Sequence, residues 1–242
     1  MTGLLLLLFS LSACAAFVQR VSGFGFGIFI MMFLPYIMPS YNEAVALSGL
    51  LSGTTALFIV IRNIRHVRWD KMLLVVLSNA VVSYVAIIYM RSLDSMFMRR
   101  LLGVLLVTVA LYFLFFESRM HLSFRSRWSR GAVGSVSGVM GSMFGMPGPP
   151  VVLYGVSEIE DKKEYMATMQ AFWLVFNMIY LFFRSGGGYY TSDTPLLWGV
   201  GVAGILLGVY IGALCFNALS RDGFKKVVYT VMLASGMVAL FK

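Results

Sequence analysis

Hydrophobic residues fill long stretches of this chain, and short charged segments separate the stretches from one another. A transmembrane helix needs about 20 apolar residues, with a range of roughly 17–25. Six uncharged runs suit one crossing each when they borrow a flanking residue or two. The pattern therefore predicts an all-α polytopic membrane protein. The six runs cover residues 44–61, 72–90, 101–116, 165–183, 194–220 and 227–241.

Two further apolar regions, 1–42 and 131–157, do not fit a single crossing. The first is too long for one helix, and three glycines interrupt it at positions 23, 25 and 27. The second contains the run Gly145-Met146-Pro147-Gly148-Pro149-Pro150. Glycine relaxes the backbone and proline removes a hydrogen-bond donor, so both runs should break a helix. At membrane depth such breaks persist only where protein or a water-filled cavity surrounds them, so we expect both inside the protein.

The composition supports a membrane protein and excludes other classes. Hydrophobic residues make up 60% of the 242 residues and charged residues 12%, whereas a soluble protein is about half apolar and a quarter charged. Two cysteines, Cys14 and Cys215, are too few for a disulfide scaffold. The net charge of +9 does not indicate a nucleic-acid partner, because Lys and Arg collect in the cytoplasmic loops of membrane proteins.

The chain repeats its own pattern. Val21-Ser22-Gly23 recurs as Val136-Ser137-Gly138, and a proline follows each glycine 12 residues later, Pro35 in the first copy and Pro150 in the second. Each copy is a Gly/Pro-broken segment followed by three apolar helices, which indicates an internal duplication. The predicted layout is a first membrane repeat over 1–116, a basic connecting loop over 117–130 and a second membrane repeat over 131–242.

The loop charges indicate whether the broken segments cross the membrane. If both cross, the two sides of the membrane carry 10 and 8 Lys and Arg; if both are re-entrant hairpins, the sides carry 13 and 5. The positive-inside rule favours the second arrangement. Each repeat is then a re-entrant hairpin plus three transmembrane helices, the two repeats are inverted, and both termini lie outside the cytoplasm. We expect a multi-pass protein of the inner (plasma) membrane.

The hairpin tips are the first candidate site. One half-helix would begin after the glycines of the first segment and another after the prolines of the second, and both would meet near the midplane. A helix N-terminus offers free N–H groups and a partial positive charge, which suits an anion. The alternative is helix packing, because Gly134 and Gly138, like Gly23 and Gly27, have small-xxx-small spacing. The candidate ligands at the tips are Gly23, Gly25, Gly27, Gly145, Gly148 and Pro149.

Polar side chains within the apolar runs add candidates. Arg20 separates two uncharged runs; an ionisable side chain at membrane depth is by default functional, and a guanidinium suits an oxyanion. Gln19 could donate a further hydrogen bond. If residues 1–19 form a complete crossing, Arg20 instead lies at the membrane surface. Asn79, Gln170 and Asn177 are the best candidates to line a cavity, although buried amides often only tie helices together.

Other features argue against catalysis. The predicted spans hold no histidine and no pair of carboxylates, so we expect neither an enzyme nor a cofactor or metal site. Glu43 and Glu158 lie at the edges of segments, where solvated positions are expected, so no carboxylate proton relay is evident. Gly204, Gly208 and Gly212 form a stripe of small residues on one helix, which predicts close helix packing.

These features together resemble the sulfite exporter TauE/SafE family of membrane permeases. The resemblance rests on Gly23-Phe24-Gly25-Phe26-Gly27 through Pro35, on its second copy from Gly138 to Pro147-Gly148-Pro149-Pro150, on the duplicated layout and on the size. The family typically has adjacent glycines in the first turn, whereas here phenylalanines alternate with them. The resemblance implies movement of sulfur-containing anions, such as sulfite or organosulfonates, across a bacterial inner membrane.

The sequence thus predicts a secondary transporter that works by alternating access, with the anion held by the two half-helix N-termini and Arg20. The expected partners are the anion and the lipid bilayer. A coupling proton or other ion and a homodimer remain open. The alternatives are an anion channel, a transporter of a small carboxylate, a membrane-embedded enzyme or a purely structural membrane protein.

Overall fold

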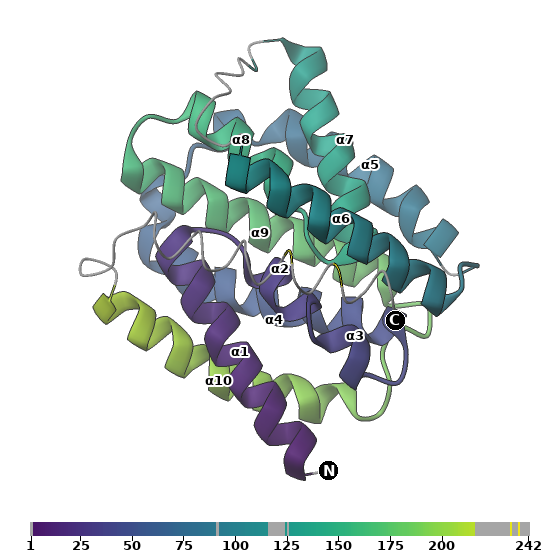
Figure 1. The fold of residues 1–242 in the computed structure, drawn as a ribbon. Helices are drawn as coiled ribbons and strands as arrows, with labels where there is room; N and C mark the ends of the chain where they lie inside the picture. The colour runs from purple at the N-terminus through teal and green to yellow at the C-terminus, as the bar shows by residue number, and fades with distance from the viewer. Residues whose placement is uncertain are drawn as a thin grey trace.

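The computed structural model describes residues 2–90, 92–115, 124, 126–215, 233 and 237, and within these ranges every regular element is a helix (Figure 1). This confirms the all-α prediction. The elements are α1 (Thr2–Ser22), α2 (Phe26–Met31), α3 (Leu34–Ile37), α4 (Tyr41–Val60), the 3-10 helices η1 (Ile61–His66) and η2 (Trp69–Lys71), α5 (Leu73–Met90), α6 (Ser95–Phe115), α7 (Arg127–Phe144), α8 (Gly148–Glu158), α9 (Lys162–Arg184) and α10 (Thr194–Cys215).

Six of the described helices are long and apolar enough to cross a membrane: α1, α4 together with η1, α5, α6, α9 and α10. Five of the six predicted crossings are therefore confirmed as helices. The sixth predicted crossing, 227–241, lies almost wholly outside the described residues. The additional long helix is α1, whose 21 residues run without a break to Ser22. The first broken region therefore begins with a helix that is long enough to span a membrane, and not with a half-length helix.

Both predicted helix breaks are present. After α1 the chain adopts left-handed backbone at Gly23 (φ +88°) and Gly25 (φ +99°), and α2 then begins. The α7 helix ends at Gly145, which is also left-handed (φ +68°). Because L side chains rarely adopt this conformation, glycine at these three positions lets the chain turn sharply. Proline in the first turn of α8 restarts the helix.

The helices α4 and α9 lie in the middle of the molecule and run antiparallel (Figure 1). At one end of the pair, Arg184, the last residue of α9, donates a hydrogen bond to the Val45 carbonyl near the start of α4 (3.5 Å). At the other end, the backbone N–H of Arg68, which follows α4, donates to the Thr168 hydroxyl near the start of α9 (3.0 Å). These contacts fix the direction of the two central helices.

The helices α1 and α10 pack closely on one side of this centre. A Cβ atom on Gly204 would overlap the carbonyl oxygen of Phe9, and one on Gly208 would overlap that of Ala13. Because the residue numbers of the contacting residues increase together along the two helices, α1 and α10 run in the same direction. The predicted close packing of the glycine stripe on α10 is confirmed.

On the other side of the centre, α7 packs against α5 in the same manner. A Cβ atom on Gly134 would overlap the Val75 carbonyl, and one on Gly138 would lie 2.9 Å from the Asn79 carbonyl oxygen. These two glycines therefore serve helix packing, which the sequence offered as the alternative to a role in an anion site. The helices α5 and α7 also run parallel to each other.

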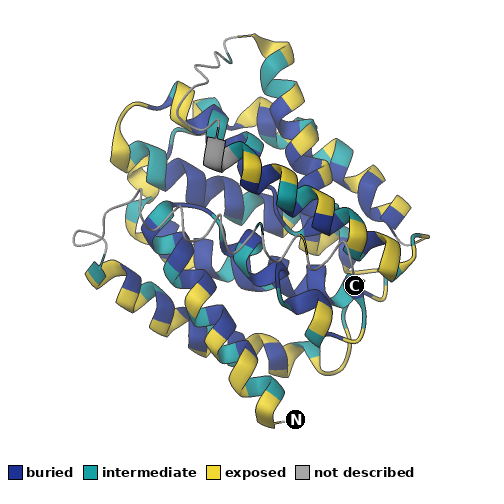
Figure 2. Ribbon diagram, in the orientation of Figure 1, coloured by how far each residue is buried: buried dark blue, intermediate teal, exposed yellow. Residues whose placement is uncertain are grey.

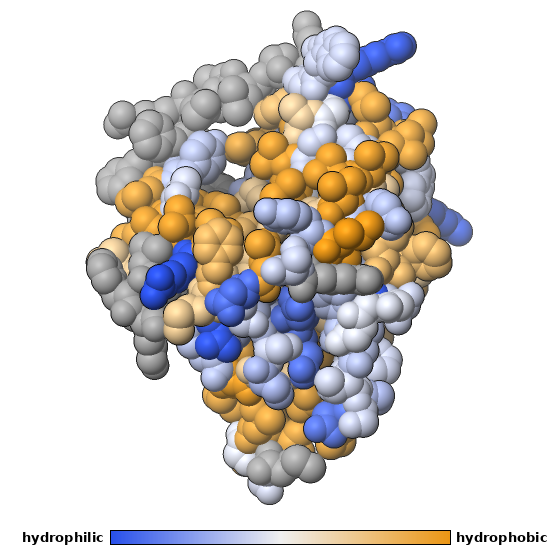
Figure 3. Space-filling view, turned by 90° about the vertical axis from the view of Figure 1, so that its right-hand side faces the viewer, coloured by the Kyte–Doolittle hydropathy of each residue, from blue (hydrophilic) through white to orange (hydrophobic). Residues whose placement is uncertain are grey.

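Burial follows this arrangement. The central helices are mostly buried, whereas the outer faces of the peripheral helices are exposed (Figure 2). Many exposed side chains are large and apolar, and they cover much of the face shown in Figure 3. An apolar surface of this extent marks contact with lipid or with another protein, as the membrane prediction requires. Exposed examples are Leu73, Val81, Val85, Phe182, Tyr210 and Leu214.

Candidate functional site

The two helix breaks meet inside the molecule. A Cβ atom on Gly27 would overlap the carbonyl oxygen of Gly145, so the first break touches the second. A pocket of about 20 Å³ lies between them, and we call it the inter-break pocket. Its lining residues come from both breaks and from three long helices: Gly25, Phe26, Gly27, Ile28, Met146, Pro147, Gly148, Gln19, Ser52 and Trp173.

Buried amide groups hold the first break in place. The Gln19 Nε2 donates to the Gln170 Oε1 at 2.7 Å, and the Gln170 Nε2 donates to the Gly23 carbonyl at 3.1 Å. The Trp173 Nε1 donates to the same carbonyl at 3.0 Å. Both glutamines are buried, where an unpaired amide would be costly. The α9 helix therefore carries the polar groups that position the turn between α1 and α2.

The first residues of each short helix line the pocket, and their backbone N–H groups are free of bonds within the helix. In α2, the first intrahelical bond runs from the Phe29 N–H to the Gly25 carbonyl, so the preceding N–H groups have no partner within the helix. In α8, Pro149 and Pro150 have no N–H, so Gly148 offers the one donor among its first three residues. No side chain caps either start among the described residues. Pro149 can therefore shape this site but cannot donate to a ligand.

The structure brings together most of the predicted site residues. Asn177 does not line the pocket but bonds two residues that do. Its Nδ2 donates to the Ser52 hydroxyl at 3.3 Å and to the Trp173 carbonyl at 2.8 Å. Trp173 was not predicted, since a tryptophan within an apolar run reads as an ordinary core residue. The predicted residues that line or adjoin the inter-break pocket are Gln19, Gly23, Gly25, Gly27, Gly145, Gly148, Pro149, Gln170 and Asn177.

Two predicted residues lie elsewhere. The Asn79 Nδ2 donates to the Tyr180 hydroxyl at 2.9 Å, beside the α5–α7 contact. Arg20 lines a separate pocket of about 390 Å³, together with Arg62, Asn63 and apolar residues of α4 and α10. The structure thus places Arg20 where α4 ends, and its role as a ligand of the anion stays a prediction.

One charged residue that the sequence did not single out is buried near the breaks. Arg184 has a relative exposure of 1%. It donates hydrogen bonds to the carbonyls of Ser142 on α7 and Val45 on α4. Its guanidinium also lies over the rings of Tyr180 and Tyr189, at 5.7 and 5.8 Å from their centroids. In the sequence, Arg184 follows an apolar run and resembles any loop residue, so only the tertiary structure identifies it as buried.

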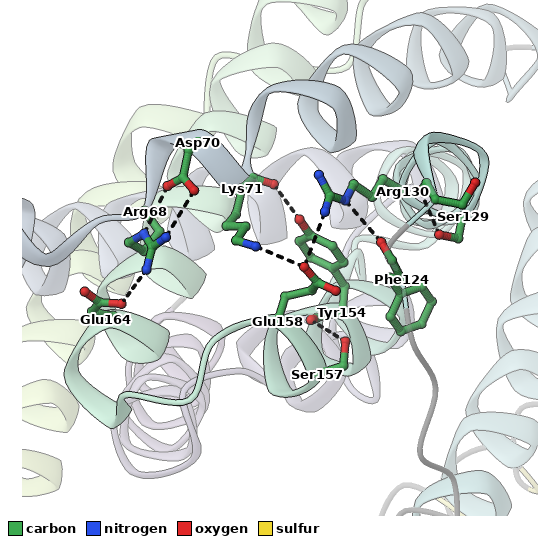
Figure 4. Close-up of polar contacts among 11 residues, drawn as sticks. Arg68, Asp70, Lys71, Phe124, Ser129, Arg130, Tyr154, Ser157, Glu158 and Glu164 are labelled. Atoms are coloured by element: carbon green, nitrogen blue, oxygen red, sulfur yellow. Dashed lines mark hydrogen bonds and ion pairs between the residues drawn. The ribbon is translucent and has the colours of Figure 1, made fainter.

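Ion pairs gather where the loop after α4 meets the α7–α8 segment and the start of α9 (Figure 4). The Glu158 Oε2 accepts from the Lys71 Nζ at 3.1 Å and from the Arg130 Nη2 at 3.4 Å. Because the Glu158 side chain is 9% exposed, the prediction that it is solvated was wrong. Arg130 lies in the first turn of α7 and Glu158 ends α8. The α7–α8 segment therefore enters and leaves at the same end of the molecule.

Two more exposed ion pairs, both made by Arg68, lie beside these groups. Arg68 bonds Asp70 at 3.0 Å and Glu164 at 3.0 Å. The hydrogen bond from Arg68 holds the pKa of the Asp70 carboxyl below its ordinary value, and the two carboxylates raise the pKa of the Arg68 guanidinium. Together with Glu158 and its partners, these groups tie the loop after α4 to the starts of α7 and α9.

The fold defines a class: a multi-pass α-helical membrane protein with two broken helices that meet around a buried polar pocket. The chain belongs to the sulfite exporter TauE/SafE family, because the family model described as Sulfite exporter TauE/SafE matches residues 8–239. That family is one of membrane transporters, so the protein is a membrane transporter. No curated protein and no solved structure matches the chain.

Proposed function

We propose that this protein is a secondary transporter that moves a small sulfur-containing anion, sulfite or an organosulfonate, by alternating access. One observation carries the proposal: two broken helices, far apart in the sequence, meet at one buried polar pocket. Broken helices in corresponding positions of two repeats are typical of a transporter's substrate site. The family adds the chemical class of the anion.

The helix contacts support two inverted repeats. In this interpretation α1 corresponds to α7, α4 to α9 and α5 to α10. The contact of α1 with α10 then corresponds to that of α7 with α5, and the antiparallel α4–α9 pair corresponds to itself. A two-fold axis in the membrane plane between α4 and α9 would produce this exchange of partners.

The ends of the short helices support two re-entrant hairpins. The Arg130–Glu158 ion pair holds the start of α7 and the end of α8 together. For the first break, α1 and α4 both run in the direction of α10. Ser12 and Leu51 lie beside Gly201, whereas Arg20 and Ile59, which come later in α1 and α4, share a pocket with residues that come later in α10, Leu206, Val209 and Ala213. The α2–α3 segment must therefore return the chain before α4 begins. By the positive-inside rule, we place the end with Lys71 and Arg130 in the cytoplasm and both termini outside it.

The inter-break pocket offers donors that suit an oxyanion. They are the backbone N–H groups at the starts of α2 and α8, the Gln19 amide and the Ser52 hydroxyl. No acidic side chain of the described chain lines the pocket. Its volume of about 20 Å³ has room for about one water molecule. A sulfonate can enter only if the two breaks move apart, so we interpret this structure as a closed state of the transport cycle.

Counterflow in proteoliposomes tests this proposal. Vesicles are loaded with unlabelled sulfite or sulfoacetate, and uptake of the labelled anion is followed over time. We expect saturable uptake that the internal anion stimulates. A Gln170→Leu variant of normal folding should lower this uptake about tenfold, because the side chain that holds the Gly23 carbonyl and the Gln19 amide beside the pocket is lost.

The other outcomes identify the alternatives. Flux that neither saturates nor responds to the internal anion indicates a channel. Uptake of acetate with no uptake of sulfonates keeps the anion site but contradicts the sulfur assignment. Equal uptake by wild type, the Gln170→Leu variant and empty vesicles would overturn the proposal.

A further inference from the structure

Arg184 is a buried cation that has no acidic partner among the described residues. It is 1% exposed, and none of the ion pairs in the described part of the chain includes it. Removing a charge from water is costly unless an opposite charge or a full set of hydrogen bonds replaces the water. Two carbonyls and two aromatic rings provide part of this compensation. The guanidinium Nε, however, finds no acceptor in the part of the chain that the structure describes.

Two hydroxyl groups near Arg184 are also unsatisfied. The hydroxyls of Tyr41 and Ser48 are fully buried and have no hydrogen-bond partner within the described ranges. These residues are seven positions apart on α4 and therefore share a face of that helix. Tyr41 lies close enough to Arg184 for an electrostatic interaction, and the Ser48 Oγ is 3.2 Å from the position of a Cβ on Gly145. Because almost all buried polar groups are paired, three unsatisfied groups that can donate require an explanation.

A short polar path connects this cluster to the inter-break pocket. The Asn177 Oδ1 and the Arg184 Nη1 lie 3.2 and 3.4 Å from the position that a Cβ on Gly49 would occupy. Asn177 donates in turn to Ser52, which lines the pocket. Gly145 contacts both places: its carbonyl oxygen lies against Gly27 of the first break, and its Cα side lies next to the Ser48 hydroxyl of the cluster. Movement of the second break away from the first would therefore alter the inter-break pocket and the surroundings of Ser48 at the same time.

We propose that Arg184, Tyr41 and Ser48 form a binding site for a small oxyanion, next to the inter-break pocket and toward the end of the molecule where α4 begins. An oxyanion carries the charge that Arg184 lacks, and its oxygens can accept from the guanidinium Nε and both hydroxyls. Sulfite and sulfonates have this chemistry, and so do carboxylates. The inference rests on the proposed function, because the anion reaches the cluster from the pocket.

The two hydroxyls can be tested directly, because a binding site and a packing defect predict different effects when they are removed. In purified protein in nanodiscs, Tyr41→Phe and Ser48→Ala are titrated with sulfite, sulfoacetate and acetate, and the dissociation constant is measured by calorimetry. We expect each variant to raise the dissociation constant about three- to tenfold, because one hydrogen bond to a charged ligand is lost. If the hydroxyls were unsatisfied only as packing defects, their removal would leave binding unchanged.

Ser12→Ala is the matched control. The Ser12 hydroxyl is also fully buried and lacks a hydrogen-bond partner among the residues described, but it lies beside Gly201, between α1 and α10. We expect this variant to bind the anions as wild type does. Arg184→Gln should weaken binding more than tenfold and Arg184→Lys less, because lysine keeps the charge; Arg65→Gln, at an exposed arginine of η1, should have no effect.

The outcomes separate this inference from the proposed function. If wild type binds no anion, the proposed function fails and the Arg184 site fails with it. If wild type binds and the Tyr41, Ser48 and Arg184 variants bind equally well, the site is wrong but the transporter proposal stands. If Arg184→Gln does not fold, the two hydroxyl variants decide, because neither disturbs the buried charge.

Discussion

At the residue scale, the site depends on glycines that act in different ways. Gly23, Gly25 and Gly145 have left-handed backbone that other residues rarely adopt. Gly27 has ordinary helical backbone within α2, and its role is to let the Gly145 carbonyl approach. The same residue type therefore makes the turns at three positions and the contact between the breaks at a fourth.

This distinction predicts the effect of Gly27→Ala. The added methyl group would overlap a backbone oxygen, so we expect about 1–3 kcal/mol of lost stability from overpacking, together with loss of anion transport. Thermal unfolding in detergent and counterflow measure the two effects. The control is Gly131→Ala in the first turn of α7, where a Cβ meets nothing within 4 Å. Wild-type stability in Gly27→Ala would show that the two breaks are not in tight contact.

At the element scale, ion pairs join the loop after α4 to the α7–α8 segment and to the start of α9. Glu158 is the central group, since it accepts from cations on two different elements while its own side chain is largely buried. The Arg68–Asp70 pair joins residues two positions apart and is exposed. The two carboxylates should therefore contribute differently to stability.

We expect Glu158→Gln to lower the free energy of unfolding by about 2 kcal/mol, because it leaves two partly buried cations without their shared partner. Asp70→Asn, the exposed control, should cost under about 1 kcal/mol. Because the folded-state pKa of Asp70 is lowered, its contribution is present at neutral pH and is lost only below about pH 4, as the pH falls through that pKa. Chemical unfolding in detergent at pH 7 compares the variants, and equal losses would contradict this difference.

At the scale of the whole molecule, the α4–α9 pair places the start of α4 and the start of α9 at opposite ends. With re-entrant hairpins these ends face opposite sides of the membrane. If both broken segments crossed completely, the loops before α4 and α9 would face the same side. The proposed alternating access depends on this difference, because inverted repeats can expose one site alternately to each side.

Single cysteines at Pro39 and Lys163, both exposed, test the topology after Cys14 and Cys215 are replaced by alanine. We expect a membrane-impermeant maleimide to label Pro39→Cys from the periplasmic side alone and Lys163→Cys from the cytoplasmic side alone. Sealed right-side-out and inverted vesicles provide the two exposures, and detergent-solubilised protein shows that both sites can react. Labelling of both positions from one side would contradict the hairpins.

By itself, the sequence determined the membrane class, five of the long helices, both helix breaks and the family. These properties depend on local composition: apolar runs of membrane length, glycines that permit a left-handed turn and prolines that remove donors. Gln19, Gln170 and Asn177 could be predicted because polar residues are conspicuous within apolar runs.

Only the tertiary structure decided which of the polar residues share a site. Gln19 and Arg20 are neighbours in the chain, yet they line different pockets, because successive residues of a helix point about 100° apart. Arg184 lies seven residues beyond Asn177, and its burial depends on contacts with α4 and α7 that no local pattern encodes. The burial of this charge is set by packing between segments that are distant in the chain, and the local pattern of the sequence does not show that packing.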